Sequence, residues 1–342
     1  MKAMVLRGPR DVGFEEVERP VPGPGQVLIR ITHSGVCGTD LKIYDGAVPV
    51  RHPLIMGHEM CGEVVDFGDR VIRDGRIQVG NRVIVDPCVS CGVCINCQCG
   101  QTNLCRHGGL VGRDSNGGFA EYLLAPLSHV FALPSEVDSQ KAPLLQVLTT
   151  CIHAQRFLNI FPGQSVVVVG LGVTGQLHLQ LAKSCGADPV IGVTRSAWKR
   201  QLAKEFGADV TFSSGSGAIR GILEATSGQG ADIVIVATGS LPTIADAISM
   251  CRPGATLQLF GITTETEGKL PFYQLYFKEL KIFNSRAATA EDFPVAVDLV
   301  ARRVVKLDAL ITHVLPLAKL SSAIEMLLTD EDQRMKIILE HR

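Results

Sequence analysis

Residues 165–175 read SVVVVGLGVTG, an apolar run that leads directly into a cluster of glycines. The apolar run predicts a buried β-strand, and residues 174–186 after it have the apolar spacing of a helix. Gly170, Gly172 and Gly175 therefore form a Gly-x-Gly-x-x-Gly turn between a strand and a helix, which is typical of a dinucleotide-binding fold. Without these flanks the same glycines would indicate only a tight turn in a parallel sheet.

Each glycine of this turn has its own expected role. Gly170 permits the tight turn, Gly172 lets the backbone approach a pyrophosphate, and Gly175 lets the helix pack closely on the strand. The first turn of the helix, with Val173 and Thr174, presents N–H groups that have no partner within the helix. The sequence therefore predicts that the phosphates of a dinucleotide bind at this turn.

The sequence on either side of the turn indicates two kinds of structure. Downstream, strand-like runs at 189–194 and 232–239 alternate with a helical pattern at 197–207, which implies a parallel sheet. Upstream, residues 1–150 are rich in glycine, proline and short alternating apolar runs, which favours a β-rich region with long loops. The tail from about residue 287 returns to loops and short elements and ends in a strand-like run. We therefore expect an α/β protein.

The composition argues against several classes of protein. The chain has 342 residues, 46% of them hydrophobic, and a formal net charge of −1, which describes a globular protein of about two domains. Nothing in this charge balance suggests a nucleic-acid partner. No apolar run reaches the roughly 18 residues needed to cross a bilayer, and the N-terminus does not resemble a signal peptide. We therefore expect a cytoplasmic protein with reduced thiols, in which a metal explains clustered cysteines better than disulfides do.

Six of the eleven cysteines lie within residues 87–105, PCVSCGVCINCQCGQTNLC. Four thiolates saturate a tetrahedral zinc ion, so a four-cysteine site is structural and not catalytic. The spacing alone does not choose which four of the six cysteines are ligands. One candidate set recurs at every third residue: Cys88, Cys91, Cys94 and Cys97. A redox sensor is the alternative interpretation of this segment.

A second set of metal-capable side chains lies in HSGVCGTD (33–40) and MGHEM (56–60). Cys37 offers a thiolate, His58 an imidazole and Glu59 a carboxylate, and zinc accepts all three. A lone cysteine is usually a core residue. Ahead of a dinucleotide fold, however, the three residues together suggest a Lewis-acid site beside a hydride acceptor.

The end of the second strand of the dinucleotide fold bears on which cofactor binds. A NAD site usually carries an acidic residue there, about 20 residues after the first glycine, to hold the ribose 2′-hydroxyl. Asp188 has about the right count but precedes the strand. The strand instead ends at Thr194 and Arg195, and Lys199 and Arg200 follow one turn later. A hydroxyl and up to three cations suit a 2′-phosphate, so the sequence favours NADP over NAD, although the same cations could simply be solvated.

Five motifs of the chain resemble those of the zinc-dependent alcohol dehydrogenases of the medium-chain dehydrogenase/reductase superfamily: GVCGTD, PLIMGHEMCGEVV, CGVCINCQCGQTNLC, GGFAEY and VVVVGLGVTG. The resemblance extends along nearly the whole chain. It implies a GroES-like, β-rich catalytic domain at residues 1–152 and 287–342. A Rossmann domain with a doubly wound parallel sheet, residues 153–286, would interrupt that domain.

The same resemblance implies roles for four residues of the first domain. Cys37 and His58 would ligate a catalytic zinc ion. Glu59 would be a third ligand, or a neighbour that assists ligand exchange. Thr39 would supply the hydroxyl that begins a proton relay.

The resemblance also selects the ligands of a structural zinc ion on a lobe at about residues 87–106. Family members use a Cys-x2-Cys-x2-Cys-x7-Cys spacing, which fits four residues here: Cys91, Cys94, Cys97 and Cys105. Gly92 and Gly100 would lie in the turns of the lobe, and Cys88 and Cys99 would be extra thiols without an assigned role. We also expect a homo-oligomer, either a dimer or a tetramer.

The sequence departs from the family pattern at two points. Gln146 stands where relatives place an acidic or cysteine zinc ligand, and an amide is a poorer ligand. Glu59 would then take a larger share of the coordination, or water would fill the place. Cys151 falls five residues late and is interpreted as a core residue. Lys42 stands where many relatives have a histidine, and it would carry protons, bind a phosphate or be merely exposed.

These parts predict the oxidation of an alcohol by hydride transfer to a nicotinamide cofactor. Further cofactor contacts are expected at the later strand ends and four residues after Gln146: Thr150, Gly261, Ile262, Ser285 and Arg286. We expect a secondary alcohol, polyol or sugar as substrate, with an L-threonine-type amino alcohol as the alternative. A zinc-free NADPH enone or quinone reductase is the alternative from another class. A zinc-ribbon binding module would explain the cysteines but not the glycine turn.

Overall fold

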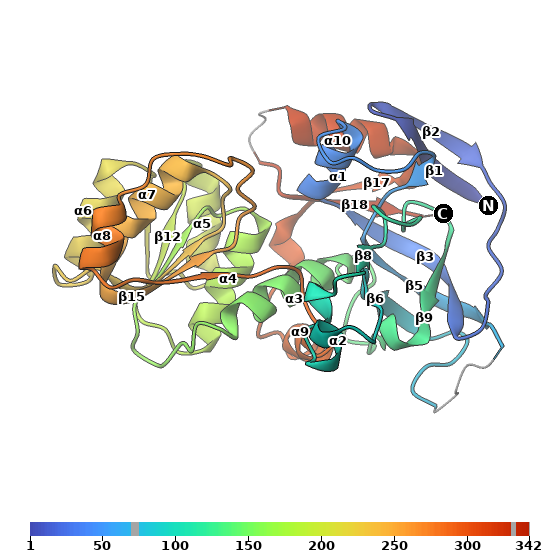
Figure 1. Ribbon diagram of the computed structural model, residues 1–342, viewed down its shortest axis with the longest axis horizontal. Helices are drawn as coiled ribbons and strands as arrows, with labels where there is room; N and C mark the ends of the chain where they lie inside the picture. Colours follow the sequence, from blue (N-terminus) through green and yellow to red (C-terminus); the bar gives the residue numbers. More distant parts are fainter. Residues whose placement is uncertain (70–74, 330–332, 342) are drawn as a thin grey trace. The chain divides into compact units, whose positions relative to one another are not determined.

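The computed structural model describes residues 1–69, 75–329 and 333–341 (Figure 1). The chain divides into two compact units, one of residues 1–149, 288–302 and 307–342 and the other of residues 150–287 and 303–306. That these units fold as independent domains with the limits expected from the sequence stays a prediction. In the described part of the chain, no helix combines the length and apolarity that spanning a membrane requires.

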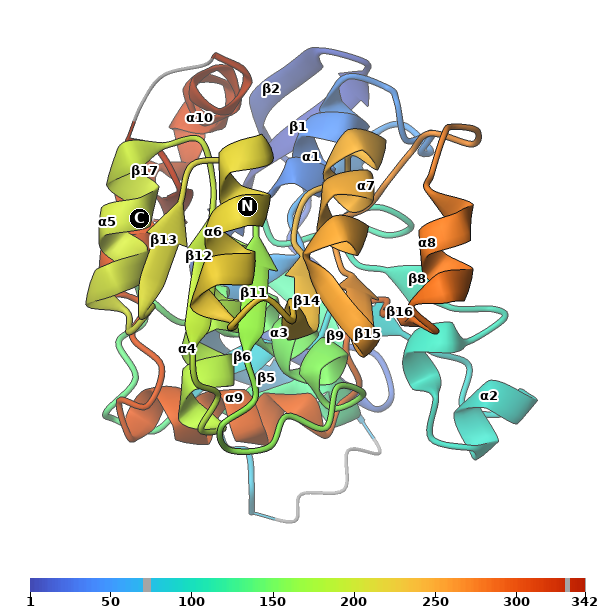
Figure 2. The same ribbon diagram turned by 90° about the vertical axis from the view of Figure 1, so that its left-hand side faces the viewer.

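The second unit contains the parallel sheet that the glycine turn predicts. Its strand order is β13-β12-β11-β14-β15-β16, and every neighbouring pair is parallel (Figure 2). The order reverses between β11 and β14, and ligands of open α/β sheets bind at such a reversal. The strands are β11 (Val166–Val169), β12 (Val190–Val193), β13 (Val210–Phe212), β14 (Ala231–Val236), β15 (Cys251–Leu259) and β16 (Lys281–Asn284).

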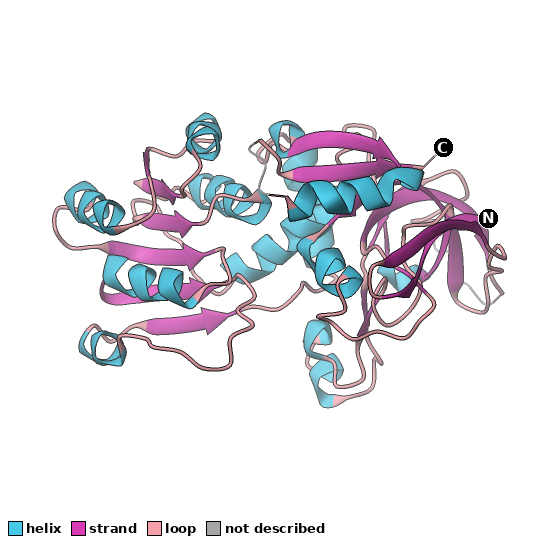
Figure 3. Ribbon diagram, turned by 90° about the horizontal axis from the view of Figure 1, so that it is seen from above, coloured by secondary structure: helices cyan, strands magenta, loops and turns pink. Residues whose placement is uncertain are grey.

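Helices cover both faces of this sheet (Figure 3). Val167 and Val169 pack in one apolar cluster with residues of α6 and α7, whereas Val166 and Val168 pack in another with residues of α4 and α5. Successive side chains of a strand point to opposite faces, so the four valines form a run that is buried on both sides. The doubly wound α/β fold is therefore confirmed. The helices are α4 (Val173–Ser184), α5 (Ala197–Glu205), α6 (Ser216–Ala225), α7 (Leu241–Met250) and α8 (Phe272–Phe277).

The first unit is rich in β-structure, as predicted. Its main sheet has the order β10-β6-β5-β3-β18-β17, with β9 also paired to β3, and two smaller sheets have the orders β2-β1-β4 and β7-β8. The strands are β1 (Lys2–Gly8), β2 (Asp11–Glu16), β3 (Gln26–Val36), β4 (Leu54–Ile55), β5 (Glu59–Phe67), β6 (Arg82–Val85), β7 (Cys88–Val89), β8 (Gly109–Leu110), β9 (Tyr122–Pro126), β10 (Val130–Ala132), β17 (Ile311–Pro316) and β18 (Lys336–Glu340).

This unit also contains helices, none of which the sequence analysis predicted. They are α1 (Gly38–Tyr44), α2 (Ile95–Gln98), α3 (Pro143–Gln155), α9 (Asp292–Ala301) and α10 (Leu320–Leu328), of which α3 belongs to the second unit from Thr150 onward. The expectation that the tail consists of loops and short elements is wrong for α9 and α10. Pro294 looks like a helix breaker, but it lies in the first turn of α9, where its missing N–H costs no helical hydrogen bond. The apolar side of α10 is buried in the core.

Candidate active site and metal centres

Cys37, His58 and Glu59 come together in the first unit, with one potential ligand atom of each within 4.8 Å of the others. Cys37 follows β3 directly and caps the N-terminus of α1. Glu59 begins β5, His58 directly precedes it, and β5 pairs with β3 along most of its length. The pairing of these two strands therefore brings together residues that are 21 positions apart in the sequence.

Asp40 orients two members of this group, although the sequence analysis gave it no role. Its carboxylate is fully buried, and Oδ2 accepts a hydrogen bond from the N–H of Cys37 (2.9 Å). Its Oδ1 faces Nδ1 of His58 at 3.3 Å. An imidazole whose Nδ1 faces a carboxylate presents Nε2 as its ligand atom, which is the usual arrangement of histidine at a metal.

The electrostatics of the group favour a cation. Burial by itself lowers the pKa of His58, but Asp40 and Cys37 raise that pKa more, so the net pKa lies well above its ordinary value. Asp40 and Glu59 are two buried carboxylates, and a divalent cation would balance their charge together with the one lysine described next. The donor set of a thiolate, an imidazole and a carboxylate fits zinc.

Lys336 is the lysine that pairs with Glu59. Its Nζ donates to Oε1 (2.9 Å) and Oε2 (2.7 Å) of Glu59 and to the carbonyl of Val36 (3.2 Å). Both charged side chains are at least 95% buried. Burial lowers the pKa of Lys336, but the charges of Glu59 and Cys37 raise that pKa by more than burial lowers it. The net pKa is therefore above the ordinary value. Glu59 is therefore close enough to be a ligand but is held by a permanent cation.

Four other residues singled out in the sequence lie on the helices of this region. Thr39 and Lys42 are half-buried on α1. Gln146 is buried on α3, where its backbone carbonyl accepts a hydrogen bond from the Thr149 hydroxyl (2.6 Å). Cys151 is fully buried on the same helix, and burial raises its pKa, which supports its interpretation as a core residue. The roles of Lys42 and Gln146 stay predictions.

The second metal-type group consists of four cysteines and has the register that the resemblance implies: Cys91, Cys94, Cys97 and Cys105. The Sγ–Sγ distances are 3.5 Å between Cys94 and Cys97 and 3.8 Å between Cys94 and Cys105. The distance between the Sγ atoms of Cys105 and Cys91 is 3.5 Å. Zinc–sulfur bonds of about 2.3 Å in a tetrahedron give sulfur–sulfur separations of about 3.8 Å. The four thiols are therefore spaced for one zinc ion.

The backbone of this lobe supports thiolates. The N–H groups of Cys97 and Arg106 lower the pKa of Cys94 to about 6, and the N–H of Cys91 donates to Sγ of Cys105 (3.3 Å). Gly92 and Gly100 lie in turns with positive φ, as expected. Cys88 and Cys99 lie outside the four-sulfur group, and no disulfide is formed by any of the eleven cysteines, all of which are described.

The glycine turn of the second unit has a different steric reason at each glycine. Gly170 ends β11 with φ of 91°, a conformation that favours glycine, and a Cβ there would overlap the Thr238 side chain. A Cβ at Gly175 would overlap the carbonyl of Gly170, so helix and strand approach closely. At Gly172 nothing lies within 4 Å of such a Cβ, so the backbone there is open to a ligand. Val173 and Thr174 form the first turn of α4.

The end of β12 is as the sequence suggests. Asp188 precedes the strand, whereas Thr194 and Arg195 follow it, and Arg195 is exposed. Arg200 donates hydrogen bonds to the carbonyls of Thr194 (2.8 Å) and Arg195 (2.6 Å), so its guanidinium braces this loop. Lys199 places its ammonium 5.4 Å from the centre of the Trp198 ring.

The remaining predicted cofactor contacts lie at the carboxyl ends of the outer strands, except Thr150, which is on α3. Gly261 and Ile262 follow β15, and a Cβ at Gly261 would overlap the backbone of Thr238 after β14. Ser285 and Arg286 follow β16, and the Ser285 hydroxyl accepts a hydrogen bond from the Gln258 side chain (3.1 Å).

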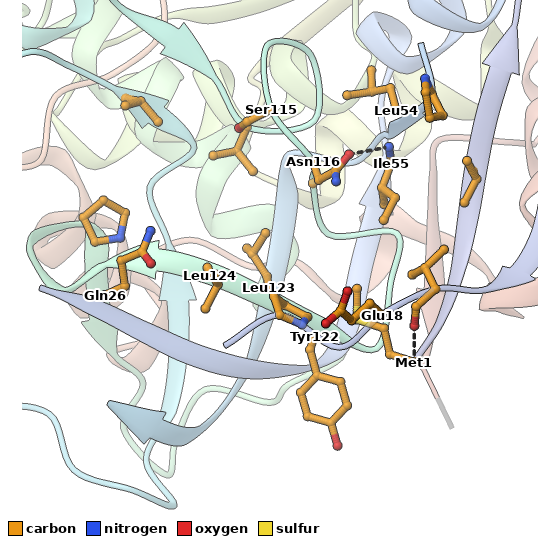
Figure 4. Close-up of a pocket in the computed structure, with 18 residues that line it drawn as sticks. Met1, Glu18, Gln26, Leu54, Ile55, Ser115, Asn116, Tyr122, Leu123 and Leu124 are labelled. Atoms are coloured by element: carbon orange, nitrogen blue, oxygen red, sulfur yellow. Dashed lines mark hydrogen bonds between the residues drawn. The ribbon is translucent and has the colours of Figure 1, made fainter. Parts of the chain in front are cut away.

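The first unit also has an apolar pocket of about 520 Å³ between its N-terminal strand, the β4 region and β9 (Figure 4). One wall carries a hydrogen bond from the N–H of Ile55 to the Asn116 side chain (3.0 Å). The lining residues include neither Cys37, His58 nor Glu59. The pocket is thus separate from the metal-type group.

Comparison with known proteins agrees with this architecture. Residues 23–135 match the model of the alcohol dehydrogenase GroES-like domain, and residues 173–302 match that of the zinc-binding dehydrogenases. A sorbitol dehydrogenase from Halalkalibacterium halodurans is 33% identical over 318 residues, which cover 92% of each chain. The chain belongs to the zinc-dependent alcohol dehydrogenase family. This dehydrogenase is therefore an NAD(P)-dependent oxidoreductase that acts on CH–OH groups, and it is not a zinc-ribbon binding module.

Solved structures share the fold of this dehydrogenase over its full length. A zinc-binding dehydrogenase from Sinorhizobium meliloti bound to NADP has a TM-score of 0.92 and 32% identity, and the match covers 99% of this chain and 98% of that one. An alcohol dehydrogenase (RspB) from Escherichia coli in complex with NADH has the same TM-score and 29% identity, with 99% of both chains covered. The two structures hold different nicotinamide cofactors.

Sequence reasoning missed two residues of the candidate site, Asp40 and Lys336. Asp40 lies within the quoted GTD motif, and an acidic residue in the first turn of a short helix is a detectable signal. Lys336 stands directly before the apolar run IIL, and a lysine that begins a fully buried strand is unusual enough to suggest a buried partner. Neither signal identifies the partner, because that depends on the tertiary fold.

Proposed function

We propose that the chain oxidises a polyol or sugar at a secondary hydroxyl, with a catalytic zinc ion held by Cys37 and His58 and with NADP as the hydride acceptor. The observation that carries this proposal is the close group of half-buried Cys37 with buried His58 and Glu59, beside which the buried Asp40 adds a second carboxylate. The polyol or sugar substrate is supported by the similarity to a sorbitol dehydrogenase.

The side chains around this group have complementary roles in the proposal. Bound zinc supplies Lewis acidity, which lowers the pKa of a substrate hydroxyl toward neutrality. Asp40 holds His58 in the tautomer that presents Nε2 and fixes the backbone of Cys37. Thr39, two residues after Cys37 on α1, receives the hydroxyl proton and passes it outward. Lys336 holds the Glu59 carboxylate through hydrogen bonds to both of its oxygens.

The experiment is a screen of kcat/KM over simple alcohols, polyols, sugars and L-threonine, each with NAD and NADP. We expect the highest values with a polyol or sugar. A clear preference for L-threonine would favour the amino-alcohol alternative. Reduction of an enone that survives Cys37→Ala would instead indicate a zinc-free reductase and would overturn the proposal.

The choice of NADP rests on Thr194 and Arg195. No carboxylate follows β12 within these residues, and the exposed Arg195 guanidinium suits a 2′-phosphate. A hydrogen bond to a charged group contributes about 1.5–3 kcal/mol, which corresponds to roughly ten- to hundredfold in affinity. Arg195→Ala should therefore raise the KM for NADP by about this factor and hardly change that for NAD.

Two further variants make this test specific. Thr194→Asp should shift the preference toward NAD, because the carboxylate repels a 2′-phosphate and accepts from a 2′-hydroxyl. Lys204→Ala, which removes an exposed cation at the other end of α5, is the matched control and should change neither KM. Preference of the unmodified enzyme for NAD would refute this part of the proposal.

We also propose a homo-oligomer of cytoplasmic chains that associates through β16 and α8. Four aromatic residues of α8 are 67–84% exposed: Phe272, Tyr273, Tyr276 and Phe277. β16 is the outermost strand in the sheet order, and exposed edges invite pairing with another strand. Antiparallel pairing of two copies about the Ile282–Phe283 bond would set Lys281 against Asn284 and Glu279 against Arg286. This self-complementarity suits a two-fold interface.

The oligomer proposal is tested by light scattering after size-exclusion chromatography. Tyr276→Glu with Ile282→Lys should give monomers, whereas the exposed Phe161→Glu, on another part of the second unit, should not. A monomeric unmodified protein, or an oligomer that the double variant leaves intact, would refute it.

A further inference from the structure

The ion pair between Glu59 and Lys336 crosses over a strand that separates the two residues. β3 pairs with β5 on one edge and with β18 on the other. Gly35 of β3 is the direct partner of Glu59 on β5 and of Ile338 on β18. Lys336 lies two residues before Ile338 and therefore on the same face. The carboxylate and the ammonium thus meet above the β3 backbone beside Gly35.

A side chain at Gly35 would occupy the place of the Glu59 carboxylate. A Cβ built there overlaps Oε2 of Glu59, and it lies 3.3 Å from both Cβ and Cδ of the same residue. These three atoms are its nearest neighbours. The φ of Gly35 is not among the positive values of this chain, so the backbone itself does not require glycine. Steric room for Glu59 is what the missing side chain provides.

A Glu59 carboxylate that is displaced from Lys336 by a side chain at position 35 needs another cationic partner. Glu59 is 1% exposed and Lys336 is 4% exposed, and a buried charge without a partner is strongly unfavourable. A potential ligand atom of Glu59 already lies within 4.8 Å of those of Cys37 and His58. A cation bound by Cys37 and His58 is therefore the alternative partner for a carboxylate that has lost Lys336.

We propose that Gly35 is a positioning residue, whose missing side chain lets Glu59 rest on Lys336 and so keeps a coordination position of the metal open for substrate. This inference rests on the proposed function, in which Cys37 and His58 hold zinc. Gly35 acts only through Glu59 and touches neither the metal nor the substrate.

The test is the variant Gly35→Ala, read out as metal retention. We expect zinc at the Cys37 site to withstand about ten- to hundredfold more chelator than in the unmodified enzyme, because Glu59 becomes a constant ligand. The four-cysteine site serves as the internal reference and should not change. Turnover should fall through kcat. Gly8→Ala is the matched control, because a Cβ at this strand glycine meets nothing within 4 Å.

A double-mutant cycle separates positioning from a general structural effect. In a Glu59→Ala background the clash is absent, so Gly35→Ala should add no further change in metal retention. Lys336→Met frees Glu59 from the other side and should also strengthen zinc binding, and it serves as the test if Gly35→Ala does not fold. Unchanged or weaker zinc binding in the folded variants, or an effect that persists without Glu59, would overturn the inference. Absence of zinc at Cys37 in the unmodified enzyme would instead overturn the proposed function.

Discussion

Cys37, His58 and Glu59 lie next to long paired strands of the first unit, whereas the four-cysteine lobe consists of a few short elements. Those elements are β7, β8, α2 and a single 3-10 turn at Thr102–Leu104. Apolar side chains of the lobe face solvent: Val93 is 75% exposed and Ile95 is 55% exposed. By contrast, His58 and Glu59 are at least 95% buried.

In the first region the fold positions the metal ligands, whereas in the lobe the bound metal would stabilise the local fold. Around His58 the sheet fixes the side chains, and the metal would add chemistry to an existing structure. In the lobe so little apolar surface is buried that the thiolate–zinc bonds would supply most of the local stability. Loss of one ligand should therefore have opposite consequences in the two regions.

The largest effect is expected for Cys37→Ala. Without this thiolate the catalytic zinc is lost, and kcat/KM should fall by about 10³-fold or more, since a Lewis acid contributes several kcal/mol. The melting temperature and the affinity for the dinucleotide should hardly change, because the strands stay paired. Cys185→Ser, at an exposed thiol of the second unit, is the control. Near-normal turnover of Cys37→Ala would contradict the comparison.

For Cys94→Ala the pattern should be reversed. We expect zinc per chain, measured by elemental analysis, to fall from about two to about one, and limited proteolysis to cleave the lobe within residues 88–105. Each kcal/mol of lost stability lowers the melting temperature by about 2–4 °C in a protein of this kind. Turnover should fall less than in Cys37→Ala. A lobe that resists protease without its zinc would show that packing holds it after all.

Graded chelation compares the two sites within one molecule. Four thiolates saturate zinc, whereas a catalytic site keeps a position for an exchangeable ligand. EDTA should therefore remove the catalytic zinc first, with loss of activity while about one zinc per chain remains. Metal content and turnover are measured in the same samples at each EDTA concentration. Simultaneous loss of both ions would argue against two different kinds of site.

The smallest effect concerns His178, which is fully buried like His58 but has a pKa lowered to about 3 by burial alone. Because this folded-state pKa lies below the ordinary value of 6.5, the unfolded chain binds the proton more readily, and stability falls as the pH drops below 6.5. Between pH 7 and pH 5 this amounts to at most about 2 kcal/mol. His178→Leu should flatten that part of the pH–stability curve, measured by urea unfolding, and should keep both zinc ions.

The sequence predicts local patterns of this protein better than contacts between distant residues. The glycine turn is a local pattern whose residue types and spacing dictate its geometry, so it was predictable. The cysteine cluster is also local, but its spacing allowed two sets of four ligands, and only the resemblance to the family selected Cys91, Cys94, Cys97 and Cys105. The pairing of Glu59 with Lys336 joins residues 277 positions apart, and the steric role of Gly35 exists only once three strands are aligned. The helix α9 was missed because Pro294 has a different meaning in a first turn than in a helix interior.

The distance along the chain between Glu59 and Lys336 has a consequence for biosynthesis. The ligands of the lobe span residues 91–105, so the lobe can capture zinc soon after this segment leaves the ribosome. The candidate catalytic group, in contrast, receives the counter-charge of Glu59 only after β18 has been made and has paired with β3. A nascent chain would therefore complete its proposed zinc lobe before its candidate active site.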